Sequence, residues 1–202
     1  MSILVYVAGG LFSIFCYDTK MKILFVRHGK SLANASSTVG TPTTPLAEEG
    51  LEQARKTGQD LRGENVSTIV CSSFIRAQQT AELIAAELGI PVYQIIVVDE
   101  LGERRMGELE GKPKRHENAF FFENDTELGF ESQKDLIARL STALDKIKTI
   151  AQATSGTTVV VGHATSGFYF QEIAKGHTQF SEFDPVYQMN NAEFLEVQLT
   201  KS

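Results

Sequence analysis

Cysteine is scarce in this sequence: only Cys16 and Cys71 occur among its 202 residues. Two cysteines this far apart provide neither a disulfide framework nor the close spacing of a zinc site. A chain without stabilising disulfides fits a reducing compartment, so we expect a cytoplasmic protein.

The sequence also lacks an excess of positive charge and a long hydrophobic run. Its net charge is -6 and its pI is about 5.3, which argues against a general nucleic-acid binder. The apolar stretch within residues 1–20 is too short to span a membrane comfortably. The basic start and the small-residue cleavage site of a signal peptide are not evident. We therefore expect neither a nucleic-acid partner nor a membrane location.

Residues 1–20 contain two β-prone runs on either side of Gly9-Gly10. This pattern favours a β-hairpin. Because Met21 would be a natural start for the following domain, we interpret residues 1–20 as an N-terminal extension and assign no chemistry to it. The edge of such a hairpin could pair with a second copy of the chain, which would give a homodimer.

From residue 21 to residue 202, predicted strands alternate with predicted helices. Short apolar or alternating runs predict strands at 22–26, 66–71, 92–98, 157–161 and 192–199. Apolar residues at helical spacing predict helices at 46–61, 74–88, 132–153 and 165–174, the second of them capped by Ser73. This order predicts one three-layer α/β/α domain, with a mostly parallel central sheet and an antiparallel edge strand. Residues 112–131, in an irregular region, would form a short cap.

Three of the predicted strands end in side chains that suit a phosphate group. The strand at 22–26 leads into Arg27 and His28, and the strand at 157–161 leads into His163. The strand at 66–71 leads to a helix with Arg76 in its first turn, where backbone N–H groups also favour an anion. Each residue alone has an ordinary structural interpretation. Together they predict a phosphate site with a nucleophile, because α/β proteins bind ligands at the carboxyl ends of their strands.

Shorter motifs extend this pattern along most of the chain. Ser31 and Asn34 follow Arg27-His28-Gly29, and Glu103 lies in a run from Leu101 to Gly111. The other motifs are Pro45-Leu46, Glu49-Gly50, Gln53-Ala54, Ser72-Ser73, Arg76-Ala77, Gln79-Thr80-Ala81, Gly129-Phe130-Glu131-Ser132, Arg139, Gly162-His163 and Asn191-Ala192. In this order, from Lys22 to Leu199, the set resembles the histidine phosphatase superfamily, also called the phosphoglycerate-mutase-like family.

The resemblance implies catalysis through a phosphohistidine intermediate. His28 would be the nucleophile that attacks phosphorus. The phosphate oxygens would be bound, and the transition state stabilised, by Arg27, Asn34, Arg76 and His163. Of these four, His163 is also predicted to be a catalytic residue. Because these donors would stabilise the phosphate charge that Mg²⁺ stabilises in other phosphoryl-transfer enzymes, we expect no metal and no other cofactor.

The resemblance also implies a general acid, for which Glu103 is the candidate. This carboxyl would protonate the leaving oxygen and then help to activate water. Glu103 could instead be a solvated residue paired with Arg104 or Arg105, and Glu108 and Glu110 are competing carboxylates.

The choice between phosphatase and mutase depends on the cover of the site. Mutases of this family usually carry a longer insertion that shields the phosphoenzyme from water, whereas only residues 112–131 are available here, and the Trp found near the mutase substrate is absent. We therefore favour a phosphoric monoester hydrolase that acts on small phosphorylated metabolites. A phosphoglycerate-mutase-type phosphotransferase and a non-catalytic module that binds phospho-ligands are the alternatives.

A basic run at the start of the predicted cap bears on the substrate. The run consists of Lys112, Lys114, Arg115 and His116, of which Lys112 and Arg115 are the named candidates. These residues could bind a second phosphate or a carboxylate of the substrate, or they could be solvated loop residues.

A cysteine phosphatase is excluded by spacing. That chemistry needs five residues between the cysteine and the arginine, and Cys71 and Arg76 are separated by four. Cys71 is therefore interpreted as a buried residue at the end of a strand.

Overall fold

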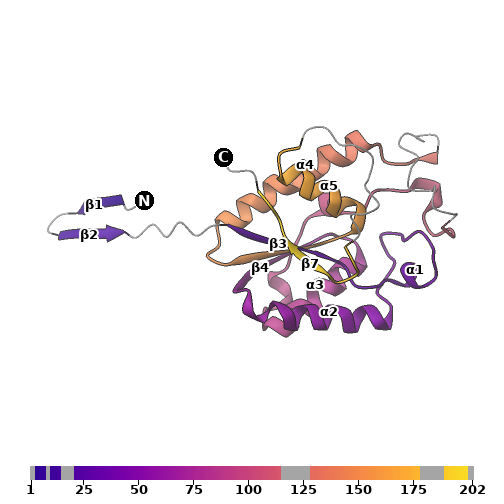
Figure 1. Cartoon of the computed structure of the whole chain (residues 1–202), viewed down its shortest axis with the longest axis horizontal. Helices are drawn as coiled ribbons and strands as arrows, with labels where there is room; N and C mark the ends of the chain where they lie inside the picture. The colour runs from indigo at the N-terminus through magenta and orange to yellow at the C-terminus, as the bar shows by residue number, and fades with distance from the viewer. Residues whose placement is uncertain (1–2, 8–9, 15–20, 115–127, 178–188, 200–202) are drawn as a thin grey trace.

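The computed structural model describes residues 3–7, 10–14, 21–114, 128–177 and 189–199 (Figure 1). Its central feature is a five-stranded sheet with the strand order β5-β4-β6-β3-β7. The strands are β3 (Lys22–Arg27), β4 (Val66–Cys71), β5 (Ile96–Val97), β6 (Thr157–Gly162) and β7 (Phe194–Glu196). The first four are parallel, and β7 pairs antiparallel with β3. The predicted α/β class with an antiparallel edge strand is confirmed.

Helices cover both faces of this sheet. The α-helices are α1 (Leu32–Ala35), α2 (Glu48–Asp60), α3 (Ile75–Leu88), α4 (Gln133–Gln152) and α5 (Ala164–Ala174). Short 3-10 helices are η1 (Leu61–Gly63), η2 (Val92–Gln94), η3 (Asp99–Leu101) and η4 (Gly107–Leu109). Figure 1 shows α2 and α3 on one side of the sheet and α4 and α5 on the other.

The alternation of side chains along β3 explains these layers. Ile23 and Phe25 belong to a buried cluster with residues of α4 and α5. Leu24 and Val26 point to the opposite face and join a cluster with residues of α3. Because both faces are covered, the central strands are continuous apolar runs rather than alternating ones.

The turn after β3 packs directly against the start of α2. A Cβ atom at Gly29 would lie 2.4 Å from the carbonyl oxygen of Gly50, and one at Gly50 would lie 2.1 Å from the carbonyl oxygen of Lys30. Neither position has room for a side chain, so both require glycine. The N–H of Gly29 also donates to Oγ1 of Thr80 on α3, at 3.1 Å. These contacts fix the turn that follows His28.

Two local predictions differ from the structure. The run at 92–98 forms η2 and only the two-residue strand β5, in which Val97 is 50% exposed, because the edge strand pairs on one side alone. Helix α3 starts after Phe74 rather than after Ser73, and no side chain caps it. The N–H of Phe74 instead donates to Oγ of Ser72, at 3.2 Å, so the serine one residue earlier takes up the free N–H.

The N-terminal strands form a separate pair. Strand β1 (Ile3–Val7) runs antiparallel to β2 (Gly10–Ile14), with Ile3 opposite Ile14 and Val7 opposite Gly10. The interpretation of residues 1–20 as an extension, and of its edge as a dimer contact, stays a prediction.

The described residues cover the predicted cap only in part, since residues 115–127 lie outside them. Across the described ranges, no helix combines the length and the apolar character needed to cross a membrane.

Candidate active site

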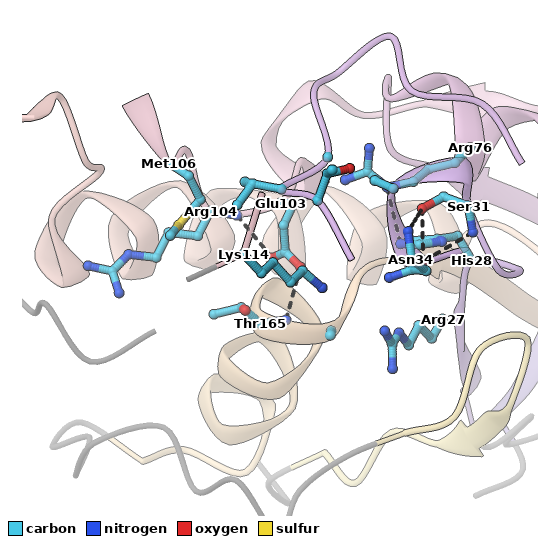
Figure 2. A pocket seen from close by; sticks show the side chains of 15 residues that line it. Arg27, His28, Ser31, Asn34, Arg76, Glu103, Arg104, Met106, Lys114 and Thr165 are labelled. Carbon is cyan, nitrogen blue, oxygen red and sulfur yellow. Dashed lines mark hydrogen bonds between the residues drawn. The ribbon is translucent and has the colours of Figure 1, made fainter. Parts of the chain in front are cut away.

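The carboxyl ends of β3, β4 and β6 meet beside a pocket (Figure 2). Its lining includes five residues predicted from the sequence, which are Arg27, His28, Asn34, Arg76 and Glu103. Figure 2 shows the first four toward one end of the pocket and Glu103 toward the other, near Arg104, Met106 and Lys114. We call these the phosphate end and the acid end. The topology thus gathers side chains from distant parts of the chain into one cavity.

The ring of His28 is held as a nucleophile would need to be. Its Nδ1 lies 2.7 Å from the carbonyl oxygen of Gly29, and since a carbonyl can only accept, Nδ1 carries the proton. The lone pair of Nε2 accepts from Nε of Arg76, at 3.1 Å. The side-chain amide of Asn191 donates to the carbonyl oxygen of His28, at 3.0 Å, and anchors its backbone. Nε2 is therefore the ring nitrogen without a proton.

Burial keeps this imidazole neutral. His28 is 5% exposed, and burial lowers its pKa well below the usual 6.5, with Arg76 and Arg27 lowering it further. The hydrogen bond to Gly29 opposes this shift without reversing it. At neutral pH Nε2 therefore keeps its lone pair, which accepts from Arg76, rather than a second proton.

Two arginines supply the positive charge of the phosphate end. Arg76 lies in the first turn of α3, stacks 5.0 Å above the ring of Phe74 and donates from Nη1 to the carbonyl oxygen of Thr41, at 2.7 Å. Arg27 donates from Nη1 to the carbonyl oxygen of Met189. Its buried Nε has no partner within the described residues. Burial lowers the pKa of both guanidinium groups, which shows that these charges lie in a site where an anion would stabilise them.

Asn34 presents its amide nitrogen to the pocket because its oxygen is already used. Ser31 is the N-cap of α1, and its N–H and Oγ donate to Oδ1 of Asn34, at 3.1 Å and 2.8 Å. The N–H of Asn34 donates back to Ser31 Oγ, which completes a capping box. The amide NH₂ is the group left to meet a phosphate oxygen.

His163 is fully buried beside His28, and the two ring centroids are 5.1 Å apart. Its Nε2 lies 2.9 Å from Oγ of Ser72 at the end of β4. Its Nδ1 is buried and has no hydrogen-bond partner among the described residues. Burial lowers the pKa of His163 well below 6.5, and Arg76 adds to this effect. In the tautomer with its proton on Nδ1, this ring could donate a hydrogen bond to an anion bound beside His28.

The carboxylate of Glu103 lies at the N-terminus of α5. It accepts from the N–H groups of Ser166 at 2.8 Å, Thr165 at 3.1 Å and its neighbour Arg104 at 2.9 Å. The N–H groups of Thr165 and Ser166 belong to the first turn of α5 and have no partner within the helix, so they fix the carboxylate on the pocket wall. Glu108 is exposed, and neither it nor Glu110 belongs to the described lining of the pocket.

The structure brings one member of the predicted basic run to the pocket. Lys112 and Lys114 are both exposed, but of these two only Lys114 belongs to the described lining of the pocket. Arg115 lies outside the described residues. Lys114 is carried to the pocket because its N–H donates to the carbonyl oxygen of Ser37, at 2.8 Å, and joins its segment to the loop after α1. The sequence alone does not separate two lysines that are two residues apart.

Two other chemistries find no support in the described part of the chain. Cys71 is fully buried, and burial raises the pKa of its thiol to about 12, so the interpretation as a buried strand-end residue is confirmed. No group of three or more His, Cys, Asp or Glu residues that could hold a metal ion occurs in the described ranges.

Comparisons with known proteins bear on the family of this chain. The profile of the histidine phosphatase superfamily (branch 1) matches residues 23–201. A protein named "Probable phosphoglycerate mutase GpmB" of Yersinia pestis (strain Pestoides F) is 35% identical over 94 residues, or 46% of this chain and only 42% of that relative.

Two solved structures show the same fold. A mycobacterial glucosyl-3-phosphoglycerate phosphatase in complex with VO3 has a TM-score of 0.69 and 21% identity, covering 87% of this chain and 90% of that chain. The phosphoglycerate mutase from Bacillus anthracis str. Sterne has a TM-score of 0.67 and 20% identity, covering 87% and 86%.

Proposed function

Because the chain belongs to the histidine phosphatase superfamily, we propose that it is a phosphomonoesterase acting through a phosphohistidine on small phosphorylated metabolites. The observation that carries this proposal is the state of His28. Its ring is neutral, Nδ1–H is tied to Gly29, and Nε2 faces Arg76 in the pocket. An imidazole lone pair beside two arginines is suited to attack a phosphoryl group that those arginines hold.

The first step forms the phosphoenzyme. Nε2 of His28 attacks phosphorus while the bond from phosphorus to the ester oxygen breaks. Arg27, Arg76 and the amide of Asn34 bind the equatorial oxygens, and Nδ1 of His163 adds a fourth contact once the phosphate is present. Glu103 in its protonated form gives its proton to the leaving oxygen, so the alcohol departs neutral.

The second step returns the enzyme to its starting state. Water attacks the phosphohistidine, the P–N bond breaks, and inorganic phosphate is released. The carboxylate of Glu103 takes a proton from that water, which restores the acid for the next cycle. Free His28 regains its neutral form.

Hydrolysis is favoured over transfer because little chain is available to exclude water. Only residues 112–131 lie between the acid segment and α4. The rival function, a mutase-type phosphotransferase, is favoured by one observation, the name of the relative that is 35% identical over 94 residues, "Probable phosphoglycerate mutase GpmB".

The acid end of the pocket bears on the substrate, because Lys114 and Arg104 line it in addition to the two arginines proposed to hold the phosphate. We therefore propose substrates with a second anionic group, such as a carboxylate.

A product analysis with the full chain tests the proposed function. Incubated with a panel of phosphomonoesters, with and without a second anionic group, the protein should release inorganic phosphate and the free alcohol in equal amounts. Turnover should be unchanged by EDTA, because protein donors supply the positive charge that a metal ion would otherwise bring. An isomeric phosphate ester without phosphate release would show a mutase, and phosphate binding without turnover would show a binding module.

The leaving group should reveal the role of Glu103. For Glu103→Gln, we expect kcat/KM for an alkyl phosphate to fall about 100-fold, and that for p-nitrophenyl phosphate to change by less than about threefold. The reason is that p-nitrophenolate is a stable anion and departs without a proton, whereas an alkoxide does not. Glu108→Gln, which alters an exposed carboxylate in the neighbouring η4, is the matched control and should leave both values unchanged. Equal slowing of both substrates by Glu103→Gln would assign this residue a different role.

A further inference from the structure

The segment that carries Glu103 has almost no regular secondary structure. It lies between η3, which ends at Leu101, and η4, which begins at Gly107. Buried backbone N–H and C=O groups need partners, and a segment outside helices and sheets must find them elsewhere. Many of these partners come from two residues, Arg139 on α4 and Glu131 just before it.

Arg139 uses all five of its N–H donors on this segment and on Glu131. Its Nη1 donates to the carbonyl oxygens of Glu100, at 2.8 Å, and Gly102, at 2.7 Å. Its Nη2 donates to the carbonyl oxygen of Glu103, at 3.1 Å, and to Oε2 of Glu131, at 2.7 Å. Its Nε donates to Oε1 of Glu131, at 2.5 Å. A guanidinium has five donors in a fixed plane, so one side chain sets the path of the chain from Glu100 to Glu103.

Glu131 holds the next two residues of the same segment. Its N–H donates to the carbonyl oxygen of Arg105, at 3.0 Å, and its Oε2 accepts from the N–H of Arg105, at 3.2 Å. Its own carbonyl oxygen accepts from Nε of Arg104, at 3.0 Å. The Glu131 side chain is 6% exposed and that of Arg139 is 15% exposed, so solvent screens this ion pair little.

From these contacts we infer that Arg139 is a positioning residue that sets the carboxyl of Glu103 against the leaving oxygen. The backbone of Glu103 is held by Arg139 on α4, and its carboxylate is held by the first N–H groups of α5. Glu103 is therefore hydrogen-bonded to two helices, and the position of its carboxyl in the pocket depends on both sets of bonds. This inference rests on the proposed function, in which Glu103 is the general acid.

The test is Arg139→Lys in the full chain, measured with two substrates. Lysine keeps the positive charge but has three donors and no planar fork, so the carbonyls of residues 100–103 cannot all be held. We expect the ratio of kcat/KM for an alkyl phosphate to that for p-nitrophenyl phosphate to fall by about 10-fold to 100-fold. A displacement of about 1 Å in a catalytic group can slow the step it catalyses by this amount. Both values come from one preparation, so the ratio is independent of the fraction of folded protein.

Two comparisons separate positioning from general structural support. Arg62→Lys alters an exposed arginine that pairs with Glu87 and should leave the ratio unchanged. In the double variant Glu103→Gln/Arg139→Lys, the ratio should be no lower than in Glu103→Gln alone, because residues that act as a unit are not additive. Glu131→Gln, which removes the charge that orients Arg139, should lower the ratio in the same direction.

Each remaining outcome identifies what has failed. If Glu103→Gln lowers the ratio and neither Arg139→Lys nor Glu131→Gln does, the positioning inference is overturned and the acid role stands. If the double variant has a lower ratio than Glu103→Gln alone, Arg139 does not act through Glu103, and the inference is again overturned. If Glu103→Gln itself leaves the ratio unchanged, that result alone contradicts the proposed role of Glu103 as general acid.

Discussion

Replacing His28 with alanine is expected to lower kcat/KM by about 10⁴-fold or more for every phosphomonoester, including p-nitrophenyl phosphate. The variant loses the lone pair that faces Arg76, and no leaving group can compensate for a missing nucleophile. The effect should therefore not depend on the leaving group, unlike that of Glu103→Gln. Steady-state assays with both substrate types measure this directly.

The phosphoenzyme provides a second readout for the same variant. Brief exposure of the wild-type protein to ³²P-labelled substrate should leave label on the chain, and His28→Ala should carry none. The matched control is His177→Ala, since His177 is an exposed histidine paired with Glu172. That variant should keep full activity and full labelling. Labelled protein in His28→Ala, or activity near that of the wild type, would show that His28 is not the nucleophile.

Replacing Arg76 with glutamine is expected to lower kcat/KM by about 10³-fold. Arg76 has three roles, because it donates to Nε2 of His28, brings positive charge to the phosphoryl oxygens and ties the loop at Thr41 to the pocket. Glutamine can replace a hydrogen bond but neither the charge nor the planar fork. Arg76→Lys should therefore recover little of the lost activity.

Ligand-induced stabilisation can separate loss of binding from loss of fold in the Arg76 variant. Inorganic phosphate should raise the Tm of the wild-type protein, because it neutralises buried arginines, and should raise that of Arg76→Gln much less. In the absence of phosphate, the Tm of the variant should stay close to that of the wild type, since the buried charge it removes is not stabilising in the empty pocket. Arg62→Gln is the surface control. Full activity of Arg76→Gln would contradict its assignment to the phosphate end.

The fold could be predicted where local signals and burial coincide. Strand β4 lies at residues 66–71, as predicted, because a β-branched run is buried on both faces of the sheet. Helix α4 begins after Ser132, whose hydroxyl accepts from the N–H of Asp135, at 3.1 Å. The run at 92–98 has a similar composition but lies at the sheet edge, where pairing on one side supports only two residues. Composition does not reveal whether a strand is central or at an edge.

The site residues could be predicted where a reactive side chain comes directly after a predicted strand. Arg27, His28 and His163 are of this kind, and Arg76 follows one turn later. The residues missed are those whose role depends on a distant neighbour. Ser72 and Asn191 lay within the motifs, but their hydrogen bonds to His163 and His28 cross between elements far apart in sequence. No periodicity or spacing along the chain carries that information.

The position of β6 between β4 and β3 has a consequence for how the site comes into being. His28 and His163 are brought together by one parallel ladder, in which Arg27 lies opposite Gly162 and the N–H of His28 donates to the carbonyl oxygen of Gly162, at 2.9 Å. Strand β6 is the last of these three strands to leave the ribosome, yet it separates the other two. Before β6 is made, the arginines of β3 and α3 are therefore not joined by a common sheet. The candidate site is complete only with the late, long-range pairing that completes the sheet.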